Sequence, residues 1–222
     1  MVKKVAIIII GELRSLKLDI VKKSLINAFQ DIQPFYFFHV SQKATTREWH
    51  KNAGIKTFTK NLSNEDVQRI KYKFNPVYFE LCDSNNIDVS DTFNPKMNDY
   101  IKALYKRIAT CFKKVEEFED KTKLKFDYVF ITRPDLIYLK KPIFNDNEVV
   151  FNWDFYFNVP RKFAKTIANV YYTFTKEGNK NYYSILQNKE KKYHSHTIKY
   201  LCIAKNIPVQ DYPISTIYRK EE

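Results

Sequence analysis

The run FDYVFITRPDLIYLKKP, residues 126–142, joins a hydrophobic segment to charged side chains that could do chemistry. Residues 128–132 are mostly apolar, which predicts a strand buried on both faces. The run then reaches Arg133, Pro134 and Asp135. Proline lacks a backbone donor and favours extended geometry at the residue before it, so the Arg133 guanidinium and the Asp135 carboxylate should lie close together. Ligands of open α/β sheets bind at this carboxyl edge, although a salt-bridged strand end without a ligand is the alternative.

The first hydrophobic run, residues 5–10, is β-branched and predicts a central parallel strand. Gly11, one of only three glycines, follows at once and indicates a backbone requirement such as a tight turn or a close ligand. We expect Ser15 to cap the next helix, which leaves Arg14 at a strand-to-helix turn suited to a phosphate. Neither GxGxxG nor GxxxxGK[ST] is present, and a structural turn with a solvated arginine is the alternative.

A second hydrophobic run, PFYFFHVS at residues 34–41, carries His39 and Ser41 at its end. If the first two strands are parallel neighbours, these side chains lie beside Gly11 and Arg14. A histidine that closes an apolar strand is more often a buried, hydrogen-bonded residue than a ligand, and that interpretation stays open.

The remaining pattern alternates helices and strands. Ser63 and Asp66 have capping-box spacing, and Asn94 with Pro95 begins a long helix whose lysines we expect to form a solvated face. Further elements are a strand at 77–82, strands at 149–151 and 155–158, a helix opened by Pro160, a helix at 197–204 and short strands in the tail. We predict a single domain over residues 1–222, with one half to about residue 140 and a mixed half from about 141 to 222.

Composition supports a globular fold, because 44% of the 222 residues are hydrophobic. Cys82, Cys111 and Cys202 lie far apart among apolar residues, which predicts buried, reduced thiols and a cytoplasmic setting. The net charge of +13 favours an anionic partner: a nucleic acid, a phosphate-bearing ligand or an anionic membrane surface. Lysine is spread along the chain, so charge alone does not choose among the three.

Taken together, a first strand ending in GxLR, a second ending in FFHVS and a later one ending in TRPDL resemble small GT-A glycosyltransferases, particularly capsular and surface-polysaccharide enzymes. The resemblance implies an α/β, GT-A-like domain, with a Rossmann-like, mostly parallel N-terminal half that binds a nucleotide sugar and a mixed C-terminal half that binds the acceptor. It also implies transfer of a sugar, which we expect to come from a UDP-sugar, to a glycan or other hydroxyl acceptor.

By position in the resembling motifs, Gly11 and Arg14 would contact the donor's diphosphate, while His39 and Ser41 would lie near its nucleoside. The turn at 133–135 occupies the place of the family's Asp-x-Asp motif, whose carboxylates hold Mn²⁺ or Mg²⁺. Asp135 is then the expected metal ligand. Because arginine replaces the first aspartate, Arg133 could instead neutralise the diphosphate with its bidentate fork. His194 or His196 could complete a metal shell, with plain loop residues as the alternative.

Asp154, next to Trp153, is our candidate for the catalytic base that takes the acceptor hydroxyl's proton. The rival is a basic, non-catalytic protein that binds nucleic acid or another polyanion. That rival does not explain why the predicted site residues follow strand ends on one edge of the sheet. A metal-dependent nuclease would explain the charge and Asp135 together, but the sequence offers no convincing second carboxylate for it. We therefore expect no nucleic-acid partner. Peripheral association with a membrane and the oligomeric state stay open.

Overall fold

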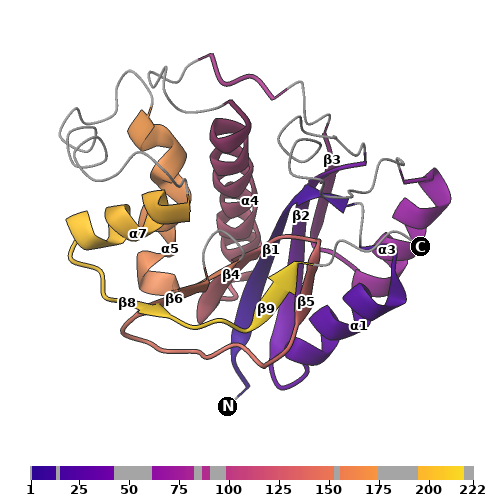
Figure 1. The fold of residues 1–222 in the computed structure, drawn as a ribbon, viewed down its shortest axis with the longest axis horizontal. Coiled ribbons are helices and arrows are strands. Elements are labelled where there is room, and N and C mark those ends of the chain that lie inside the picture. The colour runs from indigo at the N-terminus through magenta and orange to yellow at the C-terminus, as the bar shows by residue number, and fades with distance from the viewer. Residues whose placement is uncertain are drawn as a thin grey trace.

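The computed structural model describes residues 2–13, 16–42, 62–82, 87–90, 99–152, 156–174 and 195–217. Its main sheet has seven strands in the order β3-β2-β1-β4-β7-β6-β8, and β5 pairs with β9 separately (Figure 1). The strands are β1 (Lys4–Glu12), β2 (Gln33–Ser41), β3 (Tyr78–Leu81), β4 (Tyr128–Thr132), β5 (Leu136–Tyr138), β6 (Val149–Asn152), β7 (Tyr156–Pro160), β8 (Val209–Asp211) and β9 (Ser215–Ile217). The helices are α1 (Asp19–Ala28), α3 (Asn64–Phe74), α4 (Asp99–Thr122), α5 (Arg161–Ala168), the 3₁₀ helix η2 (Asn169–Phe174) and α7 (Ser195–Ala204).

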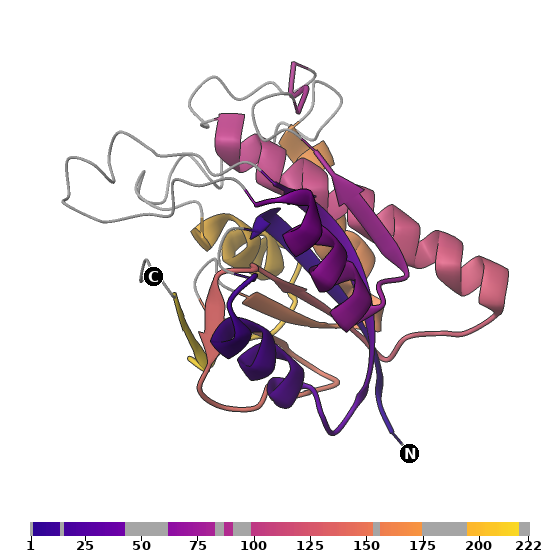
Figure 2. The ribbon, with the colours of Figure 1, turned by 90° about the vertical axis from the view of Figure 1, so that its right-hand side faces the viewer.

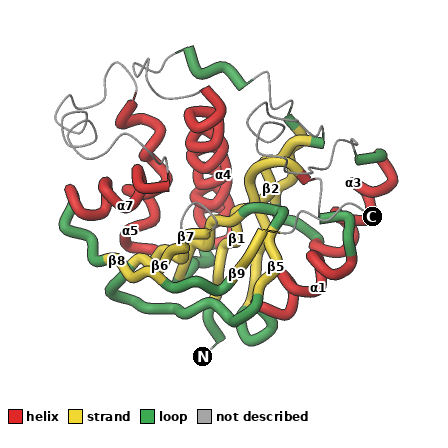
Figure 3. Tube along the Cα trace, viewed as in Figure 1, coloured by secondary structure: helices red, strands yellow, loops and turns green. Residues whose placement is uncertain are grey.

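Strand direction divides the sheet into two halves. β1 runs parallel to β2 and β4, and β3 runs parallel to β2. β7 then runs antiparallel to both β4 and β6, while β8 is parallel to β6. Figure 3 shows β7, β6 and β8 side by side at one end of the sheet. This is the predicted α/β class, with a mostly parallel N-terminal half and a mixed C-terminal half.

Helices cover both faces of the sheet, which is why the inner strand β1 is apolar at every position from Val5 to Ile10. Alternate residues of β1, beginning with Val5, pack with α1, α3 and β5. The intervening residues, beginning with Ala6, pack with α4, α5, η2 and α7. Figure 2 shows α1 and α4 on opposite sides of the sheet. Side chains alternate between faces along a strand, so the same alternation decides which residues at the strand ends face α4.

The turn between β1 and α1 differs from the prediction. α1 begins at Asp19 after Leu18, and no side chain caps it. The Leu16 N–H donates to the Leu13 carbonyl at 2.7 Å, and both leucines are fully buried. Burying them requires a turn before the helix can begin, so the expected cap at Ser15, a residue outside the described part, is wrong. The predicted stripe of Leu18, Val21, Leu25 and Phe29 is confirmed as buried.

The capping box of α3 is confirmed. The Asp66 N–H donates to Ser63 Oγ at 3.1 Å, and the Ser63 N–H donates to Asp66 Oδ2 at 3.3 Å. These reciprocal bonds satisfy two backbone donors that a helix start would otherwise leave without partners.

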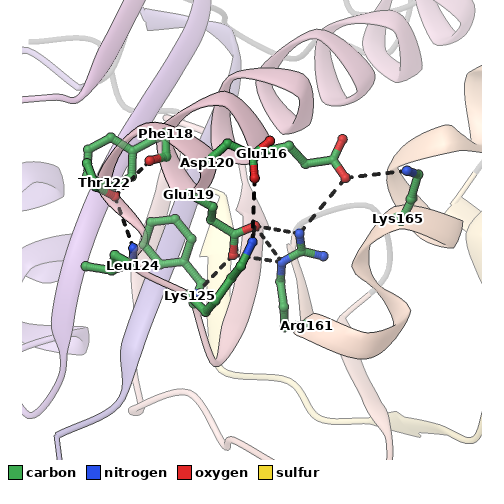
Figure 4. Close-up of polar contacts among 10 residues, drawn as sticks. Glu116, Phe118, Glu119, Asp120, Thr122, Leu124, Lys125, Arg161 and Lys165 are labelled. Carbon is green, nitrogen blue, oxygen red and sulfur yellow. Dashed lines mark hydrogen bonds and ion pairs between the residues drawn. The ribbon is translucent and has the colours of Figure 1, made fainter.

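An ion pair joins α4 to α5 near the beginning of β4 (Figure 4). Arg161 donates from Nε and Nη2 to the Glu119 carboxylate at 3.0 and 2.6 Å, and the Phe126 N–H donates to Glu119 Oε1 at 3.0 Å. Burial alone would raise the pKa of Glu119, but these hydrogen bonds and the Arg161 charge hold it below its usual range. The contact therefore stabilises the amino edge of the sheet, the edge opposite the predicted site.

The cysteines are free thiols in this structure. Cys111 and Cys202 are buried as predicted, and burial raises the pKa of both, to about 12 for Cys202. Cys82 is only partly buried. Among the described helices, none combines the length and apolar character that crossing a membrane requires.

Candidate functional site

The carboxyl ends of β2, β1 and β4 meet at one edge of the sheet. Glu12 is the register partner of Ser41 in β2, and Ile9 is the partner of Thr132 in β4. Glu12, Ser41 and Thr132 are all buried although they are polar. The three motifs singled out in the sequence therefore lie side by side, as the parallel arrangement predicted.

Gly11 has a backbone conformation that only glycine adopts readily, with φ at +118°. A Cβ at this position would lie 3.5 Å from Cδ of Pro134, an ordinary contact distance. The requirement for glycine therefore comes from the backbone angle more than from crowding. The end of β1 also packs directly against the turn that follows β4.

Arg133 and Asp135 form the close pair expected from the sequence. Arg133 donates from Nε to Oδ1 at 2.9 Å and from Nη2 to Oδ2 at 2.7 Å. The Asp135 side chain is 5% exposed and that of Arg133 is 18% exposed. Both carboxylate oxygens thus accept from one guanidinium, in a bidentate geometry that is among the strongest polar contacts in proteins.

This pairing does not fit the expected Mn²⁺ or Mg²⁺ site. A hard divalent cation needs several oxygen ligands, and both oxygens of Asp135 already accept from Arg133. Within the described ranges, no three His, Cys, Asp or Glu side chains gather closely enough to hold a metal ion. The described residues give Asp135 the role of ion-pair partner to Arg133.

His39 lies at the end of β2 on the face covered by α4. It is 7% exposed, and its Nδ1 has no hydrogen-bond partner. Burial and, to a smaller extent, the nearby positive charge of Arg107 together lower the pKa of His39 to about 4. At neutral pH the imidazole is therefore uncharged and can take part in hydrogen bonds only as a neutral group.

Arg107 of α4 belongs to this neighbourhood and was missed in the sequence. It is 3% exposed, and its Nε has no hydrogen-bond partner. The signal was present in the spacing, since Arg107 stands four residues from both Ala103 and Cys111 on the buried stripe of the helix. Lys102 is also buried, at 8% exposed, so the expectation that it lies on a solvated lysine face is wrong.

Several predicted site residues cannot be placed. Arg14, Asp154 and Trp153 lie outside the described residues, as does His194. The backbone of His196 belongs to α7. Asn152, the last described residue before Trp153, is buried at the end of β6, and β6 runs in the same direction as β4. β6 thus ends, at Asn152, on the same edge of the sheet as β4.

No protein-family model matches the chain, and no curated protein matches it in sequence. Similar solved structures include apo-form glycosyltransferase GlyE in Streptococcus pneumoniae TIGR4, at 10% identity and a TM-score of 0.35, covering 95% of this chain and 45% of that one. Galactosyltransferase LgtC in complex with donor and acceptor sugar analogues is 10% identical, with a TM-score of 0.44 and coverage of 89% and 70%. The nucleoside-diphosphate-sugar pyrophosphorylase from Vibrio cholerae RC9 is 9% identical, with a TM-score of 0.40 and coverage of 93% and 91%.

The chain spans less than half the length of the GlyE chain that it matches. Every one of these TM-scores is below 0.5, so the likeness carries no argument about the reaction. The evidence about function comes instead from the residues at the carboxyl ends of β1, β2 and β4.

Proposed function

We propose that this protein is a glycosyltransferase that moves a sugar from a nucleotide-sugar donor, a UDP-sugar in the first instance, to a hydroxyl of a glycan acceptor. One observation carries the proposal. The segments around Gly11, His39 and Arg133, which carry the sequence resemblance, end three adjacent strands at one carboxyl edge. Ligands of open α/β sheets bind in that position.

The first chemical requirement of such a transfer is a positive group for the departing nucleoside diphosphate. Negative charge develops on the diphosphate as its bond to the sugar breaks. A hydrogen-bond donor of the protein that is already held in place stabilises that charge without reorganising. Arg133 is held in place by Asp135 and remains 18% exposed. We assign Arg133 the role of binding the diphosphate and Asp135 the role of orienting Arg133.

The second requirement is recognition of the nucleoside. His39 and Ser41 project toward α4 from the end of β2, beside β1. A neutral imidazole has one donor and one acceptor nitrogen, which suits a ribose or base better than a phosphate. Asp154 remains the predicted base that accepts the proton of the acceptor hydroxyl.

The test is a panel of UDP-, GDP-, CDP- and dTDP-sugars, with a single-stranded oligonucleotide as the rival ligand. We expect one nucleotide class to raise Tm by mass action, and the matching sugar to release nucleoside diphosphate faster when an acceptor glycan is added. Stabilisation by the oligonucleotide alone, erased by added salt, would instead indicate a polyanion-binding protein.

A further inference from the structure

Arg107 is a buried cation that forms no ion pair with any carboxylate of the described residues. Arg107 is 3% exposed, and its buried Nε makes no hydrogen bond with the described residues. Arg161, on the neighbouring helix α5, is the contrasting case, because two of its nitrogens donate to the Glu119 carboxylate.

An arginine in this position is unfavourable for the free protein. The guanidinium cannot lose its proton at any ordinary pH, so burial cannot be relieved by neutralisation as it can for His39. A buried charge is stable only when an opposite charge and hydrogen bonds compensate its lost hydration. The protein alone supplies no such compensation at Nε.

Among the described residues no acid is paired with Arg107, and this includes Glu12, which is buried at the end of β1. His39, across from Arg107 on β2, is uncharged at neutral pH. Glu80, the register partner of His39 in β3, is exposed and accepts a hydrogen bond from Tyr78 Oη.

The position of Arg107 along its helix points toward the site. α4 follows β3 and ends before β4, so it runs opposite to these strands, and its N-terminal half, which includes Arg107, is the half nearer their carboxyl ends. The free N–H groups at a helix start carry partial positive charge. The start of α4 and the Arg107 guanidinium therefore favour an anion at the edge of the sheet where Arg133 also lies.

We propose that Arg107 is an anion-binding residue that takes a phosphate group of the substrate from the α4 side of the edge. Assigning that phosphate to the donor's diphosphate rests on the proposed function, whereas the need for an anion does not. A diphosphate offers acceptor oxygens on two phosphorus atoms, which allows Arg107 and Arg133 to contact it from different elements.

Three variants test this on the full chain: Arg107→Met, Arg107→Lys and, as the matched control, Arg161→Met. The probe is inorganic pyrophosphate, titrated by calorimetry and thermal shift against KCl of equal ionic strength. We expect Arg107→Met to keep or raise the Tm of the free protein, because an uncompensated charge is removed, and to weaken pyrophosphate binding about 10- to 100-fold. Arg161→Met should do the opposite, with a lower Tm and parent-like affinity.

Arg107→Lys keeps the charge without the fork, so it should fold like the parent and bind pyrophosphate with intermediate affinity. Parent-like affinity in both Arg107 variants would overturn the proposal, as would a parent protein that binds no pyrophosphate at millimolar concentration. Turnover of a nucleotide sugar with an unchanged KM in Arg107→Met would remove this inference and leave glycosyl transfer standing. Pyrophosphate binding that depends on Arg107, in a protein that turns over no nucleotide sugar, would support this inference and contradict glycosyl transfer.

Discussion

The Asp135 carboxylate accepts two hydrogen bonds from the Arg133 guanidinium, with only Pro134 between them in the chain. Proline restricts the backbone of Arg133, so the pair is set by local geometry before any ligand arrives. Each side chain neutralises the other, and the more deeply buried of the two is the acid.

This asymmetry predicts unequal costs when one partner is removed. Arg133→Met should lower the free energy of unfolding by about 3 kcal/mol, because it leaves a buried carboxylate uncompensated. Asp135→Asn should cost less, since the partly exposed arginine can be hydrated. The double variant Arg133→Met with Asp135→Leu should recover part of the loss. Urea unfolding measures all three, and single variants that each cost less than the exposed control Lys140→Met would contradict the prediction.

The same pairing predicts how the protein responds to metal. Because Arg133 occupies both oxygens of Asp135, we expect a stabilising nucleotide to raise Tm equally in excess EDTA and in Mn²⁺. Thermal shift of the parent and of Asp135→Asn under both conditions is the measurement. A shift that appears only with Mn²⁺, and disappears in Asp135→Asn, would restore Asp135 as a metal ligand.

The parts of the fold that could be predicted from sequence are those in which burial repeats regularly. The strand at residues 128–132 and the turn at Arg133 to Asp135 are both confirmed. They could be predicted because a mostly apolar run is followed closely by a proline. β1 extends through Glu12, two residues beyond the predicted end, and Glu12 is buried there despite its polarity. Hydrophobic patterns cannot show a strand that continues through a buried acid.

Long-range contacts account for the remaining differences. Pro160 opens a helix as predicted, since it is the N-cap residue of α5. The strand predicted at residues 155–158, however, continues to Pro160, which is the last residue of β7 and the register partner of Tyr128. Arg107 was overlooked because periodicity averages over a stripe, and one charge among Ala103, Cys111 and their neighbours does not alter the pattern. Its significance depends on what faces it from β2, a strand about 70 residues earlier in the chain, which spacing within one helix cannot reveal.

Gly11 provides a prediction about backbone strain. Gly11→Ala should destabilise the protein by about 1–3 kcal/mol, because alanine rarely adopts a φ of +118°. Lys123 has a φ of +60°, so Lys123→Gly should have the opposite sign and stabilise by about 1 kcal/mol or less. Denaturant midpoints of the two variants give the comparison. If Gly11→Ala is neutral, the end of β1 does not require glycine.

His39 predicts a pH dependence of stability. The pKa of His39 in the folded protein is about 4, below the ordinary value of 6.5, because burial and the Arg107 charge disfavour the imidazolium. Between pH 6.5 and pH 4 the unfolded chain therefore binds more protons than the folded one. Stability from this group is complete above about pH 6.5, falls by up to about 1.4 kcal/mol per pH unit as the pH decreases, and levels off below about pH 4.

Comparison with His39→Gln isolates this contribution, because the carboxylates that titrate in the same range are common to both proteins. The free energy of unfolding of the parent, relative to His39→Gln, should decline between pH 6.5 and pH 4 and stay constant from pH 7 to pH 8. Arg107→Met should reduce the decline, since it removes one of the two causes of the lowered pKa. A parent-minus-variant difference that is flat across the whole range would mean that His39 is hydrated or paired in solution, and would remove it from the buried cluster beside Arg107.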